Sequence, residues 1–290
     1  MANGPSTCAP ARASAVELRG TCFTRAELRA IAFMYNHEFP ASAVSARAFR
    51  SSRLLVEELR RRVPQCDGDD RCLLTQPWIQ RHAAILAGVR AHALRPEAPA
   101  SWRSNRYEWL SNIDILQVMR QYEAKHRRTF SFLDVAPMDF ASCTVSASMC
   151  TFDAAAYLRR GKKTFGAVLN LDTSDKPGSH WVALYGDMRP SSPKYGVAYF
   201  DSNGLPPPSE VSAFMERVKA TRPRTHAGRP FPLLANRKRY QFRNSECGVF
   251  AMMFIILHIE NPDDPHSQVM AMIGDDAAMN AMRPRLFVTA

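Results

Sequence analysis

QFRNSECGVFAMMFIILHIE, from Gln241 to Glu260, is the stretch around which the fold of this chain is predicted. Asn244 and Ser245 are residue types that favour an N-cap, so a helix is expected to begin just before Cys247. The run from Val249 to Leu257 is apolar nearly all round, which predicts a helix buried in the middle of a domain. The sequence therefore places one cysteine at the start of a buried helix.

Cys247 is the first candidate for a functional residue. Backbone amides at the start of a helix favour an anion, so the nucleophilic thiolate form of the side chain is favoured there. A lone cysteine beside apolar residues is more often a small buried hydrophobic residue. Partners elsewhere in the chain are needed to support a catalytic role.

Two upstream segments, both expected to be strands, supply candidate partners. SHWVALY carries His180 at the start of one strand, and YFDSNG carries Asp201 at the end of another. A cysteine protease needs a base for the thiolate, a group that orients the imidazole and a donor to the oxyanion. Gln241 is a candidate for the donor. Each of these residues alone is more often structural, so the signal lies in their combined order.

The combination resembles a known family of enzymes. SHWVALY, then YFDSNG, then a glutamine six positions before the cysteine is similar to the cysteine protease clan that contains SUMO-specific proteases and adenovirus protease. EWLSNIDILQVMRQYE, followed by FLDVAPMDF, resembles the start of the core in SUMO-protease-like enzymes of large cytoplasmic DNA viruses, including the polyprotein-processing protease of asfarviruses. The resemblance extends from Trp102 to about Phe287.

The resemblance implies a role for each candidate residue. His180 would be the base, Asp201 its orienting partner, Cys247 the nucleophile and Gln241 a side-chain amide donor to the oxyanion. Trp181 would wall the site beside the histidine, as a substrate-cleft residue. The resemblance implies no metal and no organic cofactor.

Two alternatives remain open for these roles. Some viral relatives carry asparagine as the third member, and Asn203 lies two residues after Asp201, on the same face if the strand extends that far. Asp201 is preferred because a carboxylate stabilises imidazolium better than an amide. His226 is a weaker alternative base than His180, because a strand end fixes a side chain better than a Gly-flanked loop.

The first hundred residues are predicted to form a separate helical unit. A capping box of Thr24 and Glu27 starts one helix, and further helices are expected over residues 51–62 and 78–94. A Pro-rich linker over residues 95–100 follows. We therefore expect a helical, arm-like N-terminal domain over residues 1–100 and a cysteine protease core over residues 101–290.

The core is predicted to be α+β, an adenain/SUMO-protease-like fold with a central mixed sheet. The nucleophile-bearing helix would pack on one side of the sheet, and His180 would be presented from strands on the other. Expected strands cover residues 130–135, 164–171, 181–185, 195–200 and 233–242, and expected helices begin after Ser111 and cover residues 153–159, 209–219 and 268–282.

The net charge of +11 is spread along the chain and raises the question of nucleic acid. The basic clusters at residues 60–62, 159–163 and 237–239 suggest non-specific nucleic-acid binding as a secondary property, although solvated faces explain them as well. The longest apolar run, residues 249–257, is far short of the ~20 residues that cross a bilayer, so no membrane partner is expected.

Seven cysteines without a compact spacing predict reduced thiols and argue against a metal site. A disulfide between Cys66 and Cys72 would need an oxidising compartment or a virion, and these two are taken as structural, as are Cys143 and Cys150. The first residues, MANGPSTCAPARASA, contain no leader or lipidation signal, so secretion is not expected. The expected locations are viral assembly sites in the host cytoplasm and the virion.

The leading expectation for function is a viral endopeptidase that processes structural polyprotein precursors during virion maturation. The resemblance implies cleavage after glycine or another small residue, at sites of the type Gly-Gly-Xaa, because a narrow tunnel in related enzymes excludes larger side chains. Alternatives are a SUMO or ubiquitin-like deconjugating protease, an acetyltransferase on the same scaffold, and an inactive module that binds glycine-ended tails or nucleic acid.

Overall fold

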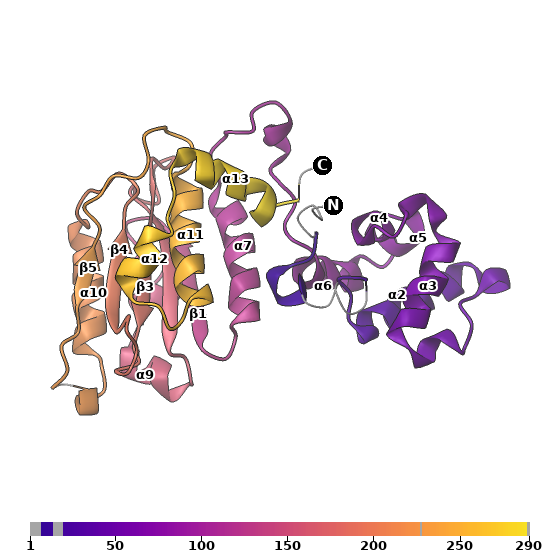
Figure 1. Cartoon of the computed structure of the whole chain (residues 1–290), viewed down its shortest axis with the longest axis horizontal. Helices are drawn as coiled ribbons and strands as arrows, with labels where there is room; N and C mark the ends of the chain where they lie inside the picture. Colours follow the sequence, from indigo (N-terminus) through magenta and orange to yellow (C-terminus); the bar gives the residue numbers. More distant parts are fainter. Residues whose placement is uncertain (1–6, 14–19, 227, 289–290) are drawn as a thin grey trace. The chain divides into compact units, whose positions relative to one another are not determined.

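The chain divides into two compact units, shown in Figure 1 in a computed structural model that describes residues 7–13, 20–226 and 228–288. The first unit comprises the chain up to Glu97 together with the residues from Leu286 onward, and the second comprises Ala98–Arg285. The backbone N–H of Val288 donates to the carbonyl of Pro96 (2.8 Å), which joins the last described residues to the first unit. The division predicted from the sequence lies instead at residue 100, with every later residue in the core.

The first unit is helical. The predicted capping box begins its first long helix, since Thr24 Oγ1 accepts from the Glu27 amide and the Thr24 amide donates to the Glu27 carboxylate (2.6 Å). The core contains fully buried Phe23, Leu28 and Leu55. The elements are η1 (Pro10–Arg12), α2 (Arg25–Glu38), η2 (Pro40–Ser42), η3 (Ala48–Arg50), α3 (Ser52–Arg62), η4 (Pro64–Cys66), α4 (Asp70–Leu74), α5 (Pro77–Gln80) and α6 (Ala83–Ala93).

The helix expected over residues 78–94 is interrupted. α5 ends at Gln80, and α6 starts after His82, whose backbone adopts a non-helical conformation (φ −104°, ψ 47°). The prediction of one continuous helix was therefore wrong. The apolar spacing on either side of His82 is helical, but spacing does not reveal a turn between two short helices.

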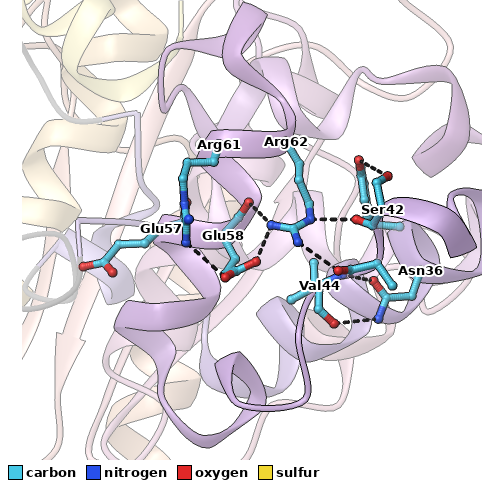
Figure 2. A network of polar contacts seen from close by, with 9 residues as sticks. Asn36, Ser42, Val44, Glu57, Glu58, Arg61 and Arg62 are labelled. Atoms are coloured by element: carbon cyan, nitrogen blue, oxygen red, sulfur yellow. Dashed lines mark hydrogen bonds and ion pairs between the residues drawn. The ribbon is translucent and has the colours of Figure 1, made fainter.

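The basic cluster at the end of α3 is engaged in contacts within the first unit (Figure 2). Arg62 donates to the Glu58 carboxylate and to the carbonyls of Ser42 (2.9 Å) and Ala43 (2.8 Å). Arg61 also pairs with Glu58, at 3.0 Å, although its side chain is 69% exposed. The cluster therefore ties α3 to the preceding loop, which is sufficient reason for its presence without a nucleic-acid partner.

Six of the seven cysteines are paired, so the expectation of reduced thiols was wrong. Each pair brings its Cα atoms to 5.2–5.3 Å, within the range that a disulfide spans. Sequence spacing did not indicate these pairs because each depends on how the intervening turns fold. The disulfides are Cys8–Cys22, Cys66–Cys72 and Cys143–Cys150.

The second unit is built on a mixed sheet of order β1-β2-β3-β4-β5. The β1–β2 and β4–β5 pairs are parallel, whereas β2–β3 and β3–β4 are antiparallel. The mixed sheet was predicted, but the strand expected over residues 233–242 is only three residues long. The strands are β1 (Phe130–Ala136), β2 (Thr164–Asn170), β3 (Trp181–Asp187), β4 (Gly196–Phe200) and β5 (Leu233–Ala235).

Helices cover both faces of this sheet. On β2, Phe165 contacts Phe214 of α10 (Ser209–Ala220), whereas the next residue, Gly166, faces Ile255 of α11 (Cys247–Glu260). Successive strand residues point to opposite faces, so α10 and α11 lie on opposite sides. α7 (Asn112–Lys125) packs on β1. Short helices are η5 (Ala100–Arg103), α8 (Ala147–Cys150), α9 (Ala154–Arg159) and η6 (Arg224–His226).

The segments around α11 differ in detail from the sequence expectation. Glu246 occupies the N-cap position, its carbonyl accepting from the amide of Phe250 (2.9 Å), and no side chain caps this helix, so the prediction of Asn244 or Ser245 was wrong. The expected helix over residues 268–282 is two helices, α12 (His266–Ala271) and α13 (Asp276–Leu286), because the chain leaves helical conformation around Gly274. No helix in the described ranges is long and apolar enough to span a membrane.

Candidate active site

Cys247 is the first residue of α11 and the free cysteine among the described residues. It is 2% exposed. The next residue, Gly248, is closely packed, since a Cβ there would lie 3.3 Å from both Leu110 Cβ and Trp181 Cδ1, and a larger residue would require these neighbours to shift. The earliest amide of α11 to bond back along the helix is that of Phe250. The first amides of the helix are therefore oriented to favour negative charge near Cys247.

His180 and Asp201 meet because of the sheet topology. β3 and β4 are antiparallel, so His180, just before β3, and Asp201, just after β4, lie at the same edge. His180 Nε2 lies 2.6 Å from Asp201 Oδ1. The carboxylate of Asp201 is fully buried and also accepts from the backbone amides of Asn203 (2.9 Å) and Leu205 (3.0 Å). Burial alone would raise the pKa of Asp201, but these hydrogen bonds and the imidazole charge lower it below its ordinary value.

The charge on His180 follows from the same contacts. Burial opposes protonation, but hydrogen bonds to Asp201 and Cys247 and the negative charges of both partners raise the pKa of His180 to about 9. Because Nε2 faces Asp201, Nδ1 is the ring nitrogen that remains for Cys247. The ring is therefore an imidazolium at neutral pH, the state that stabilises a thiolate beside it.

Asn203 also reaches the imidazole, but its contact is longer. Asn203 Nδ2 lies 3.4 Å from His180 Nε2, compared with 2.6 Å for Asp201 Oδ1. An amide N–H and a ring N–H cannot donate to each other, so Nε2–H can serve only an acceptor. Asp201 is therefore the better placed of the two residues to orient the ring.

Gln241 is held in place by neighbours on both of its amide atoms. Its Oε1 accepts from Ser202 Oγ (2.7 Å), and its Nε2 donates to the carbonyl of Arg243 (2.6 Å). The amide group carries two N–H bonds, so one remains to donate elsewhere. Ser202 was missed by the sequence analysis, which treated it only as part of a turn. Its signal was its place between Asp201 and Asn203.

A cleft of about 760 Å³ opens beside His180. Among its lining residues are the exposed aromatic side chains of Tyr107, Trp109 and Phe242, the last 70% exposed. Trp181, predicted to wall the site, packs its ring by Gly248, the residue after Cys247, and its Nε1 donates to the carbonyl of Leu110 (3.0 Å). This aromatic lining was not predicted, because an apolar residue type does not indicate that the side chain is exposed.

His226 does not join this site. It lies in η6 and stacks edge-on against Tyr195, with ring centroids 6.2 Å apart. Tyr195 precedes β4, whereas Asp201 follows it, so His226 lies toward the opposite end of that strand. His180 is the histidine that the fold brings to Cys247.

Comparison with known proteins identifies the catalytic domain. Residues 163–289 match the family described as Ulp1 protease family, C-terminal catalytic domain, and this range contains the four candidate residues from His180 to Cys247. The protein is a cysteine peptidase, homologous to viral cysteine proteases. The sequence prediction of a SUMO-protease-like cysteine peptidase is confirmed.

Two viral proteins are similar to this peptidase in sequence. It is 28% identical over 212 residues to a cysteine protease of African swine fever virus, covering 69% of this chain and 76% of the relative. It is 30% identical over 196 residues to a protein of Acanthamoeba polyphaga mimivirus named as a putative thiol protease, covering 66% and 60% respectively. A crystal structure of the African swine fever virus protease matches 100% of this chain and 98% of that chain, with a TM-score of 0.67 at 21% identity. This likeness confirms the predicted α+β fold.

Proposed function

We propose that Cys247 is the nucleophile of this peptidase, His180 its base, Asp201 the residue that orients the imidazole and Gln241 an oxyanion donor. The 2.6 Å contact between His180 and Asp201, at the edge of the sheet where α11 begins, is the observation that carries this proposal. The raised pKa of His180 supports a thiolate–imidazolium pair at neutral pH.

The reaction follows from this arrangement. The Cys247 sulfur attacks the carbonyl carbon of the scissile peptide bond, and the oxygen becomes an oxyanion that accepts from the remaining N–H of Gln241 and from the first amides of α11. The His180 imidazolium gives its proton to the leaving amine as the C–N bond breaks. The neutral imidazole of His180 then takes a proton from a water molecule, whose oxygen attacks the thioester carbon. The C–S bond breaks, the carboxylic acid leaves, and the Cys247 thiolate and the His180 imidazolium are regenerated.

The proposed substrate is a viral structural polyprotein precursor, cleaved internally after glycine or another small residue during virion maturation. The viral relatives support this choice, and the open cleft lined by Tyr107, Trp109 and Phe242 offers apolar surface to an extended polypeptide. The proposed locations are viral assembly sites in the host cytoplasm and the virion. Three disulfides favour a final state in an oxidising environment such as a released particle.

Deconjugation of a ubiquitin-like protein is the second candidate. A relative from African swine fever virus, 27% identical over 232 residues, carries the name SUMO-1 cysteine protease. Both reactions attack the carbonyl carbon of glycine or another small residue, so the same four residues serve either one. Non-specific nucleic-acid binding through the basic surface is a separate, secondary proposal.

Two reagents distinguish these functions. We expect the purified protein to cleave peptides with an internal Gly-Gly-Xaa sequence and to leave a glycine-vinyl-sulfone SUMO probe unreacted. Labelling of Cys247 by the probe, without peptide cleavage, would favour deconjugation. If the wild type and the Cys247→Ala variant behave alike in both assays, the proposed catalysis is wrong and a binding module remains.

A further inference from the structure

A glutamate–arginine pair lies buried directly beside the candidate nucleophile. Glu246 precedes Cys247 in the chain, and its side chain is 0% exposed, while that of Arg283, on α13, is 4% exposed. Arg283 Nη2 lies 3.9 Å from Glu246 Oε1. The guanidinium also lies over the ring of Trp102, at 4.7 Å from its centroid. Two opposite charges are thus enclosed at the start of α11.

The hydrogen bonding of this pair is incomplete among the described residues. Glu246 Oε1 accepts from Ser245 Oγ (2.6 Å), whereas its Oε2 is buried without a hydrogen-bond partner. Arg283 donates to the carbonyls of Glu108 (3.0 Å) and Ser245 (2.8 Å), whereas its Nε has no partner. A buried pair of this kind contributes little or nothing to stability compared with apolar residues of similar volume. Stability alone does not explain it.

The position of the Glu246–Arg283 pair connects it with the candidate nucleophile. Arg283 holds the carbonyl of Ser245, two residues before Cys247, and so fixes the segment that leads into α11. Its contacts with Ser245 and Glu246, the two residues before Cys247, place the guanidinium at the start of α11, where the sulfur also lies. Burial lowers the pKa of Arg283 in spite of the negative charges of Glu246 and Cys247. A guanidinium stays protonated in proteins, which makes this charge permanent.

The charges around the sulfur come from several elements. His180 precedes β3, and its partner Asp201 follows β4. Glu246 precedes α11, and Arg283 belongs to α13. Arg106, in the segment before α7, adds a positive charge that acts on Arg283.

We propose that Arg283 is a positioning residue that holds the start of α11 and favours the thiolate of Cys247, and that the carboxylate of Glu246 moderates this effect. The inference rests on the proposed role of Cys247 as nucleophile. It assigns to the buried pair an electrostatic function at the sulfur in addition to its hold on the backbone.

The test is the pH dependence of Cys247 alkylation by iodoacetamide, followed by mass spectrometry on the full chain without reductant, so that the paired cysteines do not react. In Arg283→Gln, the midpoint of the alkylation profile is expected to move upward by about one pH unit, because a permanent cation is lost and Glu246 is left unbalanced. In Glu246→Gln it is expected to move downward. The double variant should return toward the wild-type midpoint. Movement in opposite directions is the signature of charge, which a purely structural role would not give.

Two further variants keep the test decisive. Arg285→Gln makes the same change at an exposed position of the same helix and should leave the midpoint unchanged. If Arg283→Gln does not fold, Glu246→Gln and Arg283→Lys carry the test, with a lowered midpoint expected for the first and a near-normal one for the second. An unchanged midpoint in Glu246→Gln, or a shift of both single variants in the same direction, would overturn the inference. If the wild type cleaves no peptide while the alkylation midpoints of the variants shift as expected, the proposed function would be wrong and the inference about Arg283 would stand.

Discussion

The two units use the same side-chain types for different ends. In the first unit, the described cysteines form disulfides, and the arginines at the end of α3 bind Glu58 and nearby carbonyls at the surface (Figure 2). The second unit also contains a disulfide, Cys143–Cys150, but it leaves Cys247 free and buries the Glu246–Arg283 pair beside it. The difference teaches that a free thiol and a buried ion pair with incomplete hydrogen bonding indicate a functional site, because such groups contribute little to stability.

The largest expected effect concerns the free and paired cysteines. Cys247→Ala should reduce Gly-Gly-Xaa peptide cleavage to background while leaving thermal unfolding almost unchanged. Replacing Cys66 and Cys72 together by alanine should do the reverse, lowering the stability of the first unit by roughly 2 kcal/mol without affecting cleavage. Loss of activity in the double alanine variant, measured at a temperature where it remains folded, would contradict this division of roles.

The next effect separates the two candidate orienting residues. Asp201→Asn should lower kcat by about 10³–10⁴-fold, because an amide neither stabilises imidazolium as a carboxylate does nor fixes the same tautomer. Asn203→Ala should lower it less than tenfold, given its longer contact with the ring. Steady-state kinetics on one peptide substrate suffice. Full activity in Asp201→Asn would transfer the role to Asn203.

Removing the amide of Gln241 should have a smaller effect. Gln241→Ala is expected to lower kcat by about 10²–10³-fold with little change in KM, since an oxyanion donor acts in the transition state. Ser202→Ala leaves that amide present but unfixed on its oxygen side, so we expect roughly a tenfold loss. A KM effect alone in Gln241→Ala would show that the residue binds substrate instead.

The buried imidazolium predicts a pH dependence of stability. The pKa of His180 is raised from 6.5 to about 9 in the folded protein, so its stabilising contribution is complete below pH 6.5 and is lost as the pH rises toward 9. Denaturant unfolding between these pH values should show falling stability in the wild type and a flatter profile in His180→Gln. Equal slopes would indicate that the ring is neutral in the folded state.

The smallest expected effect lies in the surface network of the first unit. Arg62→Ala should lower the free energy of unfolding by about 1 kcal/mol, because it removes hydrogen bonds to Glu58, Ser42 and Ala43. Arg61→Ala should cost less than about 0.5 kcal/mol, as its side chain is largely exposed. Chemical denaturation of both variants tests the ranking. A larger loss for Arg61 would mean that exposure is a poor guide to the contribution of these pairs.

Much of the site could be predicted because its residues stand at ends of regular elements. Apolar continuity identified α11, and short β-rich runs identified β3 and β4, so the positions of His180, Asp201 and Cys247 followed from the sequence. Their mutual distances required the antiparallel pairing of β3 with β4, which the sequence implied only through the family resemblance. The structure supplies that pairing.

The remainder depends on contacts between distant parts of the chain. Arg283 and the Glu108 carbonyl that it binds are 175 residues apart, and nothing in the local sequence of either indicates the other. The early end of β5 at Ala235 has the same origin. The next residue, Asn236, still donates its backbone amide to Tyr199 (3.4 Å), but its side chain donates to the carbonyl of Asp201 (2.7 Å) and accepts from the Asp201 amide (2.8 Å), bonds that a continuing strand would make with its backbone. Residue patterns describe single elements, and such tertiary contacts override them.

The return of the last described residues to the first unit has a consequence for synthesis. The amide of Val288 bonds to the carbonyl of Pro96, so one partner leaves the ribosome long after the other. The five strands of the second unit, which end at Ala235, are synthesised between these two partners. The first unit therefore gains its contact with Val288 only after every strand of the sheet has been made.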